Sequence, residues 1–207
     1  MDGYKGMLIV ISGPSGVGKS TICKSLIEKK LNNVELSVSA TTRKQRISEV
    51  DGISYYFKSE HEFQEMIYRN EFLEYAKVYD NYYGTPKQHV IDKLVKGINV
   101  ILEIDTHGAM QVKSNYEKGV FIFIMPPCFN ILKTRILKRG TESKGDIKKR
   151  LESAFGEIHE IINYDYIVVN DDVDKAVDKI VCILNAESCR TNRYKIDFTE
   201  FKEEFYD

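Results

Sequence analysis

The fold of this chain is decided by the stretch Gly13-Pro14-Ser15-Gly16-Val17-Gly18-Lys19-Ser20, which Thr21 follows. It fits the pattern G-x-x-x-x-G-K-[ST] of a phosphate-binding loop. The apolar run 7–11 before it is rich in branched residues, as a buried parallel strand should be. The segment 22–30 after it carries its apolar residues on one helical face. Strand, glycine-rich loop and helix in this order predict a cradle for polyphosphate.

The chemistry of such a loop follows from its backbone. Glycines let successive backbone N–H groups converge on phosphate oxygens, and the helix N-terminus adds a favourable dipole. Lys19 can then neutralise charge on the β- and γ-phosphates, while the Ser20 hydroxyl can reach Mg²⁺. A glycine turn that binds nothing is the alternative. It is disfavoured because four fixed positions and both flanking elements agree.

Composition limits the classes of protein to which the chain can belong. Its 207 residues suit one α/β domain with inserted subdomains, and its net charge of −1 provides no field that would attract nucleic acid or an anionic membrane. Apolar runs such as 120–125 are too short to cross a bilayer, which takes roughly 20 residues. The four cysteines form no C-x-x-C pair and are expected to be buried free thiols. With no secretory segment visible, we expect a cytoplasmic protein without nucleic-acid or membrane partners.

Strands and helices alternate along the chain, which predicts a parallel sheet covered by helices on both faces. The expected core strands are 7–11, 34–39, 99–105, 120–125 and 166–170. The expected helices are 22–30, 86–96, 108–114, 128–139, a longer one capped by Asp146, and 173–186. The apolar face expected for the longer helix consists of Ile147, Leu151, Ala154, Phe155, Ile158 and Ile162. The tail 191–207 is expected to form one more helix.

Residues 41–85 interrupt this alternation and predict a small mixed insertion. A hairpin-type turn is expected at Asp51-Gly52 before a strand at 53–57, and Ser59-Glu60-His61-Glu62 reads as a capping box that opens a helix. A strand is expected at 72–79, with the chain turning at 81–84.

Three polar features suggest what accepts a phosphoryl group. Arg43 and Arg46 follow the second strand, and guanidinium groups match phosphate oxygens bidentately, although a solvated basic loop explains them equally well. Glu74 lies in an apolar strand pattern, and a carboxylate can accept from the adjacent N1–H and N2–H₂ donors of guanine. A hydroxyl from Ser39 or Thr85 could serve guanine O6. On spacing alone, however, Glu74 reads as an outward residue of a half-buried strand.

Together these segments resemble the guanylate kinase family over about residues 7 to 186. The resemblance rests on the phosphate-binding loop and on further segments in the same order: Ser37-Val38-Ser39-Ala40-Thr41-Thr42-Arg43-Lys44-Gln45-Arg46, Glu49-Val50-Asp51-Gly52, Tyr55-Tyr56-Phe57, Phe72-Leu73-Glu74-Tyr75-Ala76, Asn81-Tyr82-Tyr83-Gly84-Thr85, Leu102-Glu103-Ile104-Asp105, Arg139-Gly140-Thr141-Glu142 and Val169-Asn170-Asp171-Asp172. It implies a P-loop kinase core at 1–40, 86–125 and 164–207, a GMP-binding insertion at 41–85 and a helical lid at 126–163.

The resemblance also implies roles for individual residues. The implied GMP site consists of a phosphate clamp, Arg43, Arg46, Tyr55 and Tyr83, and of groups around the guanine, Ser39, Glu74, Thr85 and Asp105. The implied ATP site consists of residues 13–21, namely Gly13, Pro14, Ser15, Gly16, Val17, Gly18, Lys19, Ser20 and Thr21, with Asn170 near the adenine. The implied catalytic cations are Lys19, Arg43, Arg135, Arg139 and Arg150.

For the metal, the resemblance implies Mg²⁺ held through Ser20, with Glu103 acting through water. The family usually has Asp at the position of Glu103, one methylene shorter. Ser is common where this chain has Thr85, and that change keeps the hydroxyl.

The activity expected from the resemblance is reversible transfer of the ATP γ-phosphoryl group to GMP, with dGMP and the oligomeric state left open. Two alternatives remain at this point. A kinase for AMP, shikimate or a nucleoside would share the core, but Glu74 with Ser39 disfavours it. A non-enzymatic module that binds partner peptides would gain nothing from the intact loop 13–20.

Overall fold

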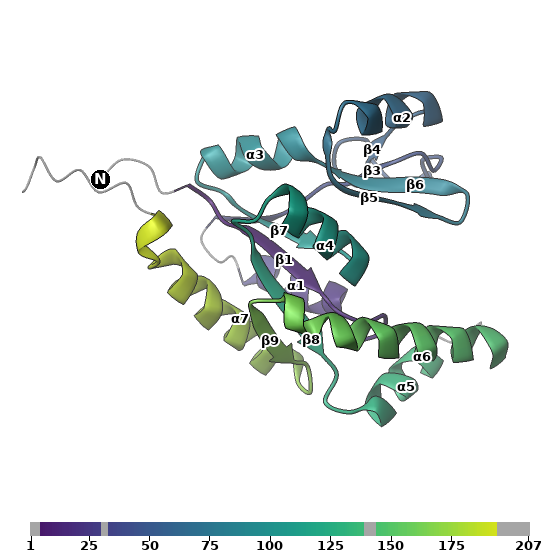
Figure 1. Ribbon diagram of the computed structural model, residues 1–207, viewed down its shortest axis with the longest axis vertical. Coiled ribbons are helices and arrows are strands. Elements are labelled where there is room, and N and C mark those ends of the chain that lie inside the picture. Colours follow the sequence, from purple (N-terminus) through teal and green to yellow (C-terminus); the bar gives the residue numbers. More distant parts are fainter. Residues whose placement is uncertain (1–4, 30–32, 139–143, 194–207) are drawn as a thin grey trace, which may run out of the picture.

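A five-stranded parallel sheet lies at the centre of the molecule (Figure 1). The structure is a computed structural model that describes residues 5–29, 33–138 and 144–193. Side chains are described for these residues except 138 and 144–149. The strand order is β2-β7-β1-β8-β9, with bounds β1 Leu8–Ser12, β2 Val34–Leu36, β7 Asn99–Glu103, β8 Val120–Met125 and β9 Tyr166–Val169. β1 and β7 pair with Ile11 opposite Glu103, so the loop after β1 and the acids after β7 meet at one edge.

Helices cover both faces of this sheet. Along β1, Ile9 and Ile11 pack with α1 (Lys19–Glu28), α5 (Phe129–Lys138), α6 (Lys144–His159) and α7 (Val173–Ser188). Leu8 and Val10 pack on the other face with α3 (Lys87–Val95) and α4 (Thr106–Asn115). Both faces of β1 are therefore buried, which explains its unbroken apolar sequence.

A second sheet of four strands lies beside the core, in the order β4-β3-β6-β5 (Figure 1). Its strands are β3 Ala40–Thr41, β4 Tyr56–Phe57, β5 Phe72–Val78 and β6 Asn81–Pro86. Helix α2 (Glu60–Tyr68) packs on this sheet through the buried Phe63, whose ring stacks on Phe72 with centroids 4.4 Å apart. The Ser59 capping box is present as predicted.

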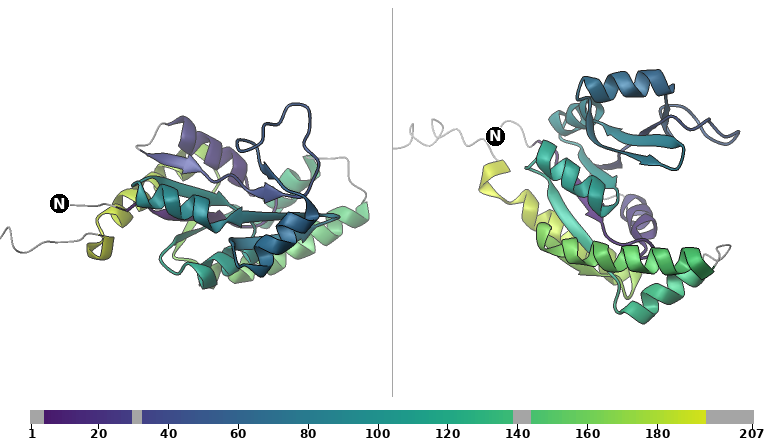
Figure 2. Two further views of the ribbon diagram at one scale, coloured as in Figure 1. Left: turned by 90° about the horizontal axis from the view of Figure 1, so that it is seen from above. Right: turned by 45° about the vertical axis from the view of Figure 1, so that its right-hand side comes forward.

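Helices α5 and α6 extend beyond the central sheet on the side away from the small sheet, as the views in Figures 1 and 2 show. The short 3-10 helix η1 (Glu160–Asn163) links α6 to β9, and η2 (Thr191–Arg193) follows α7. No helix among the described segments is long and apolar enough to cross a membrane.

The α/β class with a helix-flanked parallel sheet is confirmed, and three local predictions are wrong. Residues 81–84 do not turn the chain but begin β6, because the reversal occurs earlier, where Tyr79 takes φ +53°. The second core strand ends at Leu36 rather than at residue 39. Asp51-Gly52 makes no hairpin, since β3 and β4 run parallel.

Helix α6 also differs from expectation. It begins at Lys144, so Asp146 lies inside the helix instead of at the capping position before it. Phe155 is 58% exposed, and Ile162, in η1, is 85% exposed. Among the described side chains of α6, Ala154 is buried in the core and Leu151 packs against it, as predicted.

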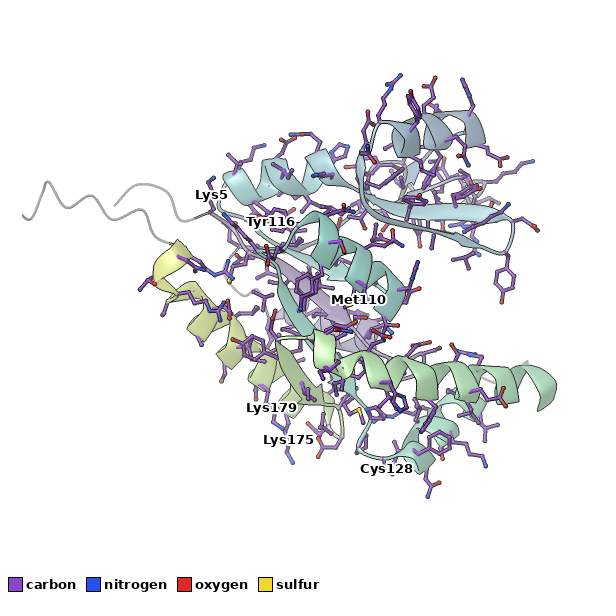
Figure 3. The ribbon with its side chains drawn as sticks, in the orientation of Figure 1. Lys5, Met110, Tyr116, Cys128, Lys175 and Lys179 are labelled. Atoms are coloured by element: carbon purple, nitrogen blue, oxygen red, sulfur yellow. The ribbon has the colours of Figure 1, made fainter. Side chains whose placement is uncertain are left out.

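The cysteine prediction holds only for Cys23, which is buried. Cys182 and Cys189 lie at the exposed side of α7 and after it, and Cys128 lies exposed before α5 (Figure 3). The helix expected at 191–207 lies outside the described residues from 194 onward.

Candidate active site

The phosphate-binding loop connects the end of β1 to the start of α1. Gly13 has φ +139°, and a Cβ there would lie 2.4 Å from the carbonyl oxygen of Ile124. Gly18 has φ +95°, and its Cβ would lie 2.6 Å from Asn170 Nδ2. Only glycine fits these positions, because both the backbone angle and the space exclude a side chain. The loop therefore runs pressed against the ends of β8 and β9.

Lys19 folds back over this loop. Its Nζ donates to the carbonyl oxygens of Gly13 and Pro14, the latter at 3.2 Å. Burial lowers the pKa of Lys19, while the carboxylates of Glu157 and Glu103 act in the opposite direction. An anion bound in the loop would add further negative charge and favour the charged ammonium.

A polar cavity of ≈ 400 Å³ opens in front of the loop. Its lining combines loop residues with residues at and just after the end of β7 and with one acid from α6: Ser15, Gly16, Gly18, Lys19, Ser20, Glu103, Ile104, Asp105 and Glu157. The Ser20 hydroxyl donates to Glu103 Oε1 at the edge of this cavity. A hydroxyl and a carboxylate beside a polyphosphate loop are hard oxygen donors of the kind that Mg²⁺ prefers, so these residues fit the metal.

The helices α5 and α6 bring two arginines to the loop. Arg135 donates to the carbonyl oxygens of Val17, at 3.4 Å, and Asn170, at 3.0 Å. Arg150 Nη2 donates to Ser15 Oγ at 2.7 Å. Arg139, the third arginine implied for this region, lies outside the described residues.

Asn170 lies at the end of β9 beside the same loop, as expected. It is 2% exposed, and its Nδ2 donates to the carbonyl oxygen of Val17 at 2.7 Å. Its Oδ1 is buried and finds no hydrogen-bond partner within the described part of the chain. An unpaired buried acceptor is costly, so this oxygen is suited to receive a donor from a ligand.

A second polar cavity, of ≈ 170 Å³, adjoins the first. It is lined by the ends of β2 and β7 and by residues of the small sheet and its loops: Leu36, Ser37, Ser39, Ser54, Tyr55, Thr85, Leu102, Glu103 and Ile104. Both cavities include Glu103 and Ile104 in their walls. Two ligands could therefore face each other across the end of β7.

Glu74 is a buried carboxylate of β5, 8% exposed, and not the outward residue that spacing alone allowed. The Thr85 hydroxyl donates to its Oε1 at 2.6 Å. Burial raises the pKa of Glu74 to about 7; the hydrogen bond from Thr85 acts against this shift, and the nearby negative charge of Asp105 adds to it. Asp105 itself caps α4 by accepting from the backbone N–H of Gly108 at 2.7 Å.

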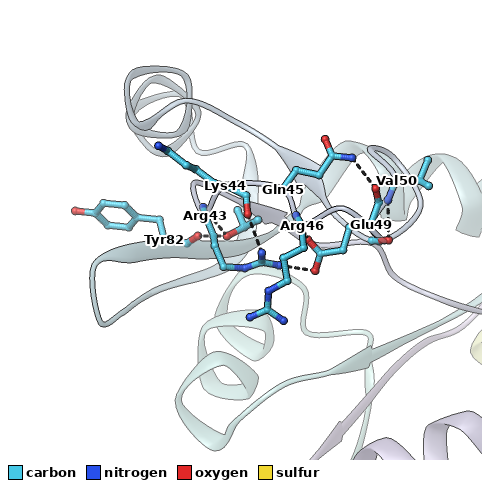
Figure 4. Close-up of polar contacts among 9 residues, drawn as sticks. Arg43, Lys44, Gln45, Arg46, Glu49, Val50 and Tyr82 are labelled. Carbon is cyan, nitrogen blue, oxygen red and sulfur yellow. Dashed lines mark hydrogen bonds and ion pairs between the residues drawn. The ribbon is translucent and has the colours of Figure 1, made fainter.

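Arg43 is held in place before any anion arrives (Figure 4). Its Nη2 lies 2.7 Å from Glu49 Oε1, and its guanidinium lies 5.5 Å from the centroid of the Tyr55 ring. The hydrogen bond to Glu49 raises the pKa of Arg43, and a smaller hydrogen-bond contribution comes from Tyr83. The rings of Tyr55 and Tyr83 meet edge to face at 6.1 Å.

Arg46 extends from the same loop, and its side chain is exposed (Figure 4). Its backbone N–H donates to Glu49 Oε2 at 2.9 Å. Glu49 thus orders the loop that carries both arginines. Sequence reasoning assigned Glu49 no role, because an acid in a basic loop gives no signal of which arginine it contacts.

Glu157 was also missed. Its carboxylate accepts from Ser153 Oγ at 2.9 Å and lies in the cavity with Lys19. Burial raises the pKa of Glu157, and the charge of Lys19 lowers it. One signal was available: Glu157 follows Arg150 by two helical turns and so shares its face of α6.

The fold and the two cavities define a P-loop nucleotide-binding protein with a second ligand pocket. The guanylate kinase family model matches residues 5–187. The chain is 56% identical to a guanylate kinase of Caldanaerobacter subterraneus, over 97% of both chains, and 57% identical to one of Clostridium tetani, over 92% of this chain and 91% of that one. The crystal structure of guanylate kinase from Anaplasma phagocytophilum superimposes with a TM-score of 0.72 at 36% identity, covering 93% of this chain and 92% of that one.

The chain belongs to the guanylate kinase family.

Proposed function

We propose that this protein catalyses reversible transfer of the γ-phosphoryl group of ATP to GMP, which yields ADP and GDP. The observation that carries the proposal is the wall, formed by Glu103 and Ile104, that two polar cavities share. One cavity includes the phosphate-binding loop, and the other includes hydroxyl groups suited to a purine and adjoins the arginine-bearing loop of the small sheet.

On the donor side, the backbone of the loop 13–18 and Lys19 bind the triphosphate. Arg135 and Arg150 already contact the loop and are positioned to add charge at the phosphates. Asn170, whose buried Oδ1 has no hydrogen-bond partner in the described part of the chain, is the residue assigned to the adenine. Mg²⁺, with Ser20 and Glu103 as its protein-side partners, supplies charge neutralisation and alignment of the phosphates when bound.

On the acceptor side, Arg43 and Arg46 hold the GMP phosphate with the hydroxyl groups of Tyr55 and Tyr83. Ionised Glu74 accepts from guanine N1–H and N2–H₂, which adenine does not offer together. Ser39, Thr85 and Asp105 complete the surroundings of the base. dGMP is a further acceptor to be tested.

The chemical step needs no general base. The second pKa of a phosphomonoester is about 6, so the acceptor phosphate is mostly dianionic near neutral pH and nucleophilic. One of its oxygens forms a bond to the γ-phosphorus while the bond from that phosphorus to the bridging oxygen of ADP breaks. Repulsion between the two anions is the obstacle, and Lys19 with the arginines offsets it while holding the phosphates in line.

The proposed organisation comprises a core at 1–40, 86–125 and 164–207, a GMP-binding insertion at 41–85 and a lid at 126–163. The separate small sheet and the projecting pair α5 and α6 support this division. We propose the cytoplasm as the location, which agrees with four free thiols in a reducing compartment.

The test is product identification. Incubation with MgATP and GMP, followed by ³¹P NMR, should give ADP and GDP in equal amounts. Lys19→Ala and Arg43→Ala should each lower the rate about 100-fold or more while leaving the circular dichroism spectrum unchanged. ATP hydrolysis without GDP, or wild-type rates from either variant, would refute the proposal.

A further inference from the structure

We propose that Gln111 and Asn115, two side chains of α4, are positioning residues that set the guanine-reading carboxylate of Glu74. This inference rests on the proposed function. Helix α4 belongs to the core, and its buried face, with Ala109 and Val112, packs on the central sheet. Its neighbouring positions face the insertion instead.

β5 is the edge strand of the small sheet, so one row of its backbone groups is not paired by β6. The amide of Gln111 pairs with two of these groups. Gln111 Oε1 accepts from the N–H of Tyr75 at 3.1 Å, and its Nε2 donates to the carbonyl oxygen of the same residue at 3.0 Å. One side chain thus acts as a neighbouring strand would, immediately after Glu74.

The residue before Glu74 is held in the same way. The pairing of β5 with β6 shifts between Phe72, opposite Pro86, and Glu74, opposite Thr85, so Leu73 is the extra residue of a bulge. Pro86 has no N–H to offer at this point. Asn115 Nδ2 donates to the carbonyl oxygen of Leu73 at 2.8 Å. Bonds from one helix therefore hold the backbone on both sides of Glu74.

The carboxylate itself meets the first turn of the same helix. A Cβ added to Gly108 would lie 3.3 Å from Glu74 Oε2 and 3.4 Å from Asp105 Oδ1. Oε1 is occupied by the Thr85 hydroxyl. Gln111 and Asn115 thus fix the backbone, while Gly108 and Thr85 define where the carboxylate can lie. The position of β5 relative to α4 therefore determines where the Glu74 carboxylate lies in the proposed guanine pocket.

The test compares Gln111→Ala, Gln111→Glu and Asn115→Ala with Ser114→Ala. Gln111→Glu keeps an acceptor for Tyr75 N–H and loses the donor. Ser114 is the matched control because it is exposed on the same helix and its hydroxyl donates to the carbonyl oxygen of Met110 within that helix. Met110 is labelled on α4 in Figure 3. kcat, KM for GMP and KM for ATP are measured for each, with IMP as a second acceptor. IMP keeps N1–H but lacks the 2-amino group.

Gln111→Ala should raise KM for GMP about tenfold, leave kcat and KM for ATP within about twofold, and lower the ratio of kcat/KM for GMP to that for IMP. Asn115→Ala should act in the same direction, Gln111→Glu should fall between, and Ser114→Ala should match the wild type. Equal losses for GMP and IMP, a parallel rise in KM for ATP, or unchanged kinetics would overturn the inference. Failure of the wild type to phosphorylate GMP would instead refute the proposed function.

Discussion

Among single residues, Glu74 most directly links burial to the proposed specificity for guanine. A carboxylate in a buried position prefers to be neutral, and its pKa is raised to about 7 for that reason. Only the ionised form accepts from both guanine donors. The same burial that excludes water and strengthens these bonds therefore makes recognition depend on pH in the neutral range.

The raised pKa of Glu74 determines the direction in which GMP recognition should change with pH. Below pH about 7, Glu74 of the free protein is protonated, and above it the carboxylate is ionised. kcat/KM for GMP should rise as the pH increases from 6 to 8, beyond the rise due to the GMP phosphate, whose pKa is about 6. Glu74→Gln should lose GMP preference over AMP and retain only the contribution of the phosphate. A pH profile that is identical for wild type and Glu74→Gln would contradict this assignment.

The raised pKa of Glu74 also makes the stability of the folded protein depend on pH, in the direction opposite to that of GMP binding. The folded pKa of Glu74 lies above its ordinary value of 4.5, so the native state binds more protons between these values and stability falls as pH rises through that range. Above about pH 7 Glu74 is ionised in both the folded and the unfolded protein, so the free-energy cost of burying its charge no longer changes with pH. The site is thus less stable where it binds better, as functional sites often are.

Among the helices and strands, α2 is an element whose capping contacts stabilise the fold without lining the candidate site. Ser59 accepts from the backbone N–H of Glu62, and Glu62 accepts from that of Ser59, so both ends of the box are formed. None of these atoms lines the two cavities at Glu103 and Ile104.

Ser59→Ala should lower the free energy of unfolding by about 1 kcal/mol, because the backbone N–H of Glu62 loses its acceptor, the Ser59 hydroxyl. kcat and KM for GMP should stay within about twofold of wild type at 25 °C. Urea denaturation measures the change in the free energy of unfolding, and steady-state kinetics measure kcat and KM for GMP. A large rise in KM for GMP would mean that α2 contributes to the site, contrary to this account.

Some helices and strands could be predicted from the sequence, and others could not. Core strands were found because buried parallel strands carry continuous apolar runs, and the loop 13–20 because its spacing reflects phosphate geometry. The strand β6 was mistaken for a turn, since polar and aromatic residues around Gly84 fit either structure until β5 is in place. The apolar face assigned to α6 is confirmed at Leu151 and Ala154 and wrong at Phe155 and Ile162, because nothing in the helix sequence reveals that it projects from the core.

The same division holds for the site. In the proposed site, Lys19 and Ser20 follow from the motif, whereas Arg43, Arg46 and Glu74 had equally good or better alternative explanations until the family resemblance was considered. Glu49, Glu157 and Gln111 were missed because their partners are set by tertiary contacts: a loop arginine, a lysine on another helix and the backbone of an edge strand. Composition and periodicity do not identify such partners, although helical spacing does place Glu157 on the same face of α6 as Arg150.

The whole molecule is a core with two projecting parts, one bearing the small sheet and the other α5 and α6 (Figure 2). The cavities meet where these parts face the ends of β1 and β7. Ligands that contact both the core and a projecting part bind only the folded form and should stabilise it.

Thermal unfolding provides the corresponding prediction. GMP or a non-hydrolysable ATP analogue with Mg²⁺, each at about 100 times its Kd, should stabilise the protein by about 2.7 kcal/mol, and the Tm should rise by about 5–10 °C. Lys19→Ala should lose the response to the ATP analogue and keep that to GMP. An equal rise with AMP and GMP would contradict the assignment of the acceptor cavity.

The central claim is that one cleft holds a triphosphate donor beside a guanine-bearing acceptor. It is tested most directly by kcat/KM for phosphoryl transfer from MgATP to GMP, AMP, UMP and dGMP under identical conditions. The account predicts that GMP exceeds AMP and UMP by at least about 100-fold, since a site built for hydrogen bonding rejects bases that leave its buried groups unpaired. Comparable values for GMP and AMP, or no transfer to GMP, would contradict it.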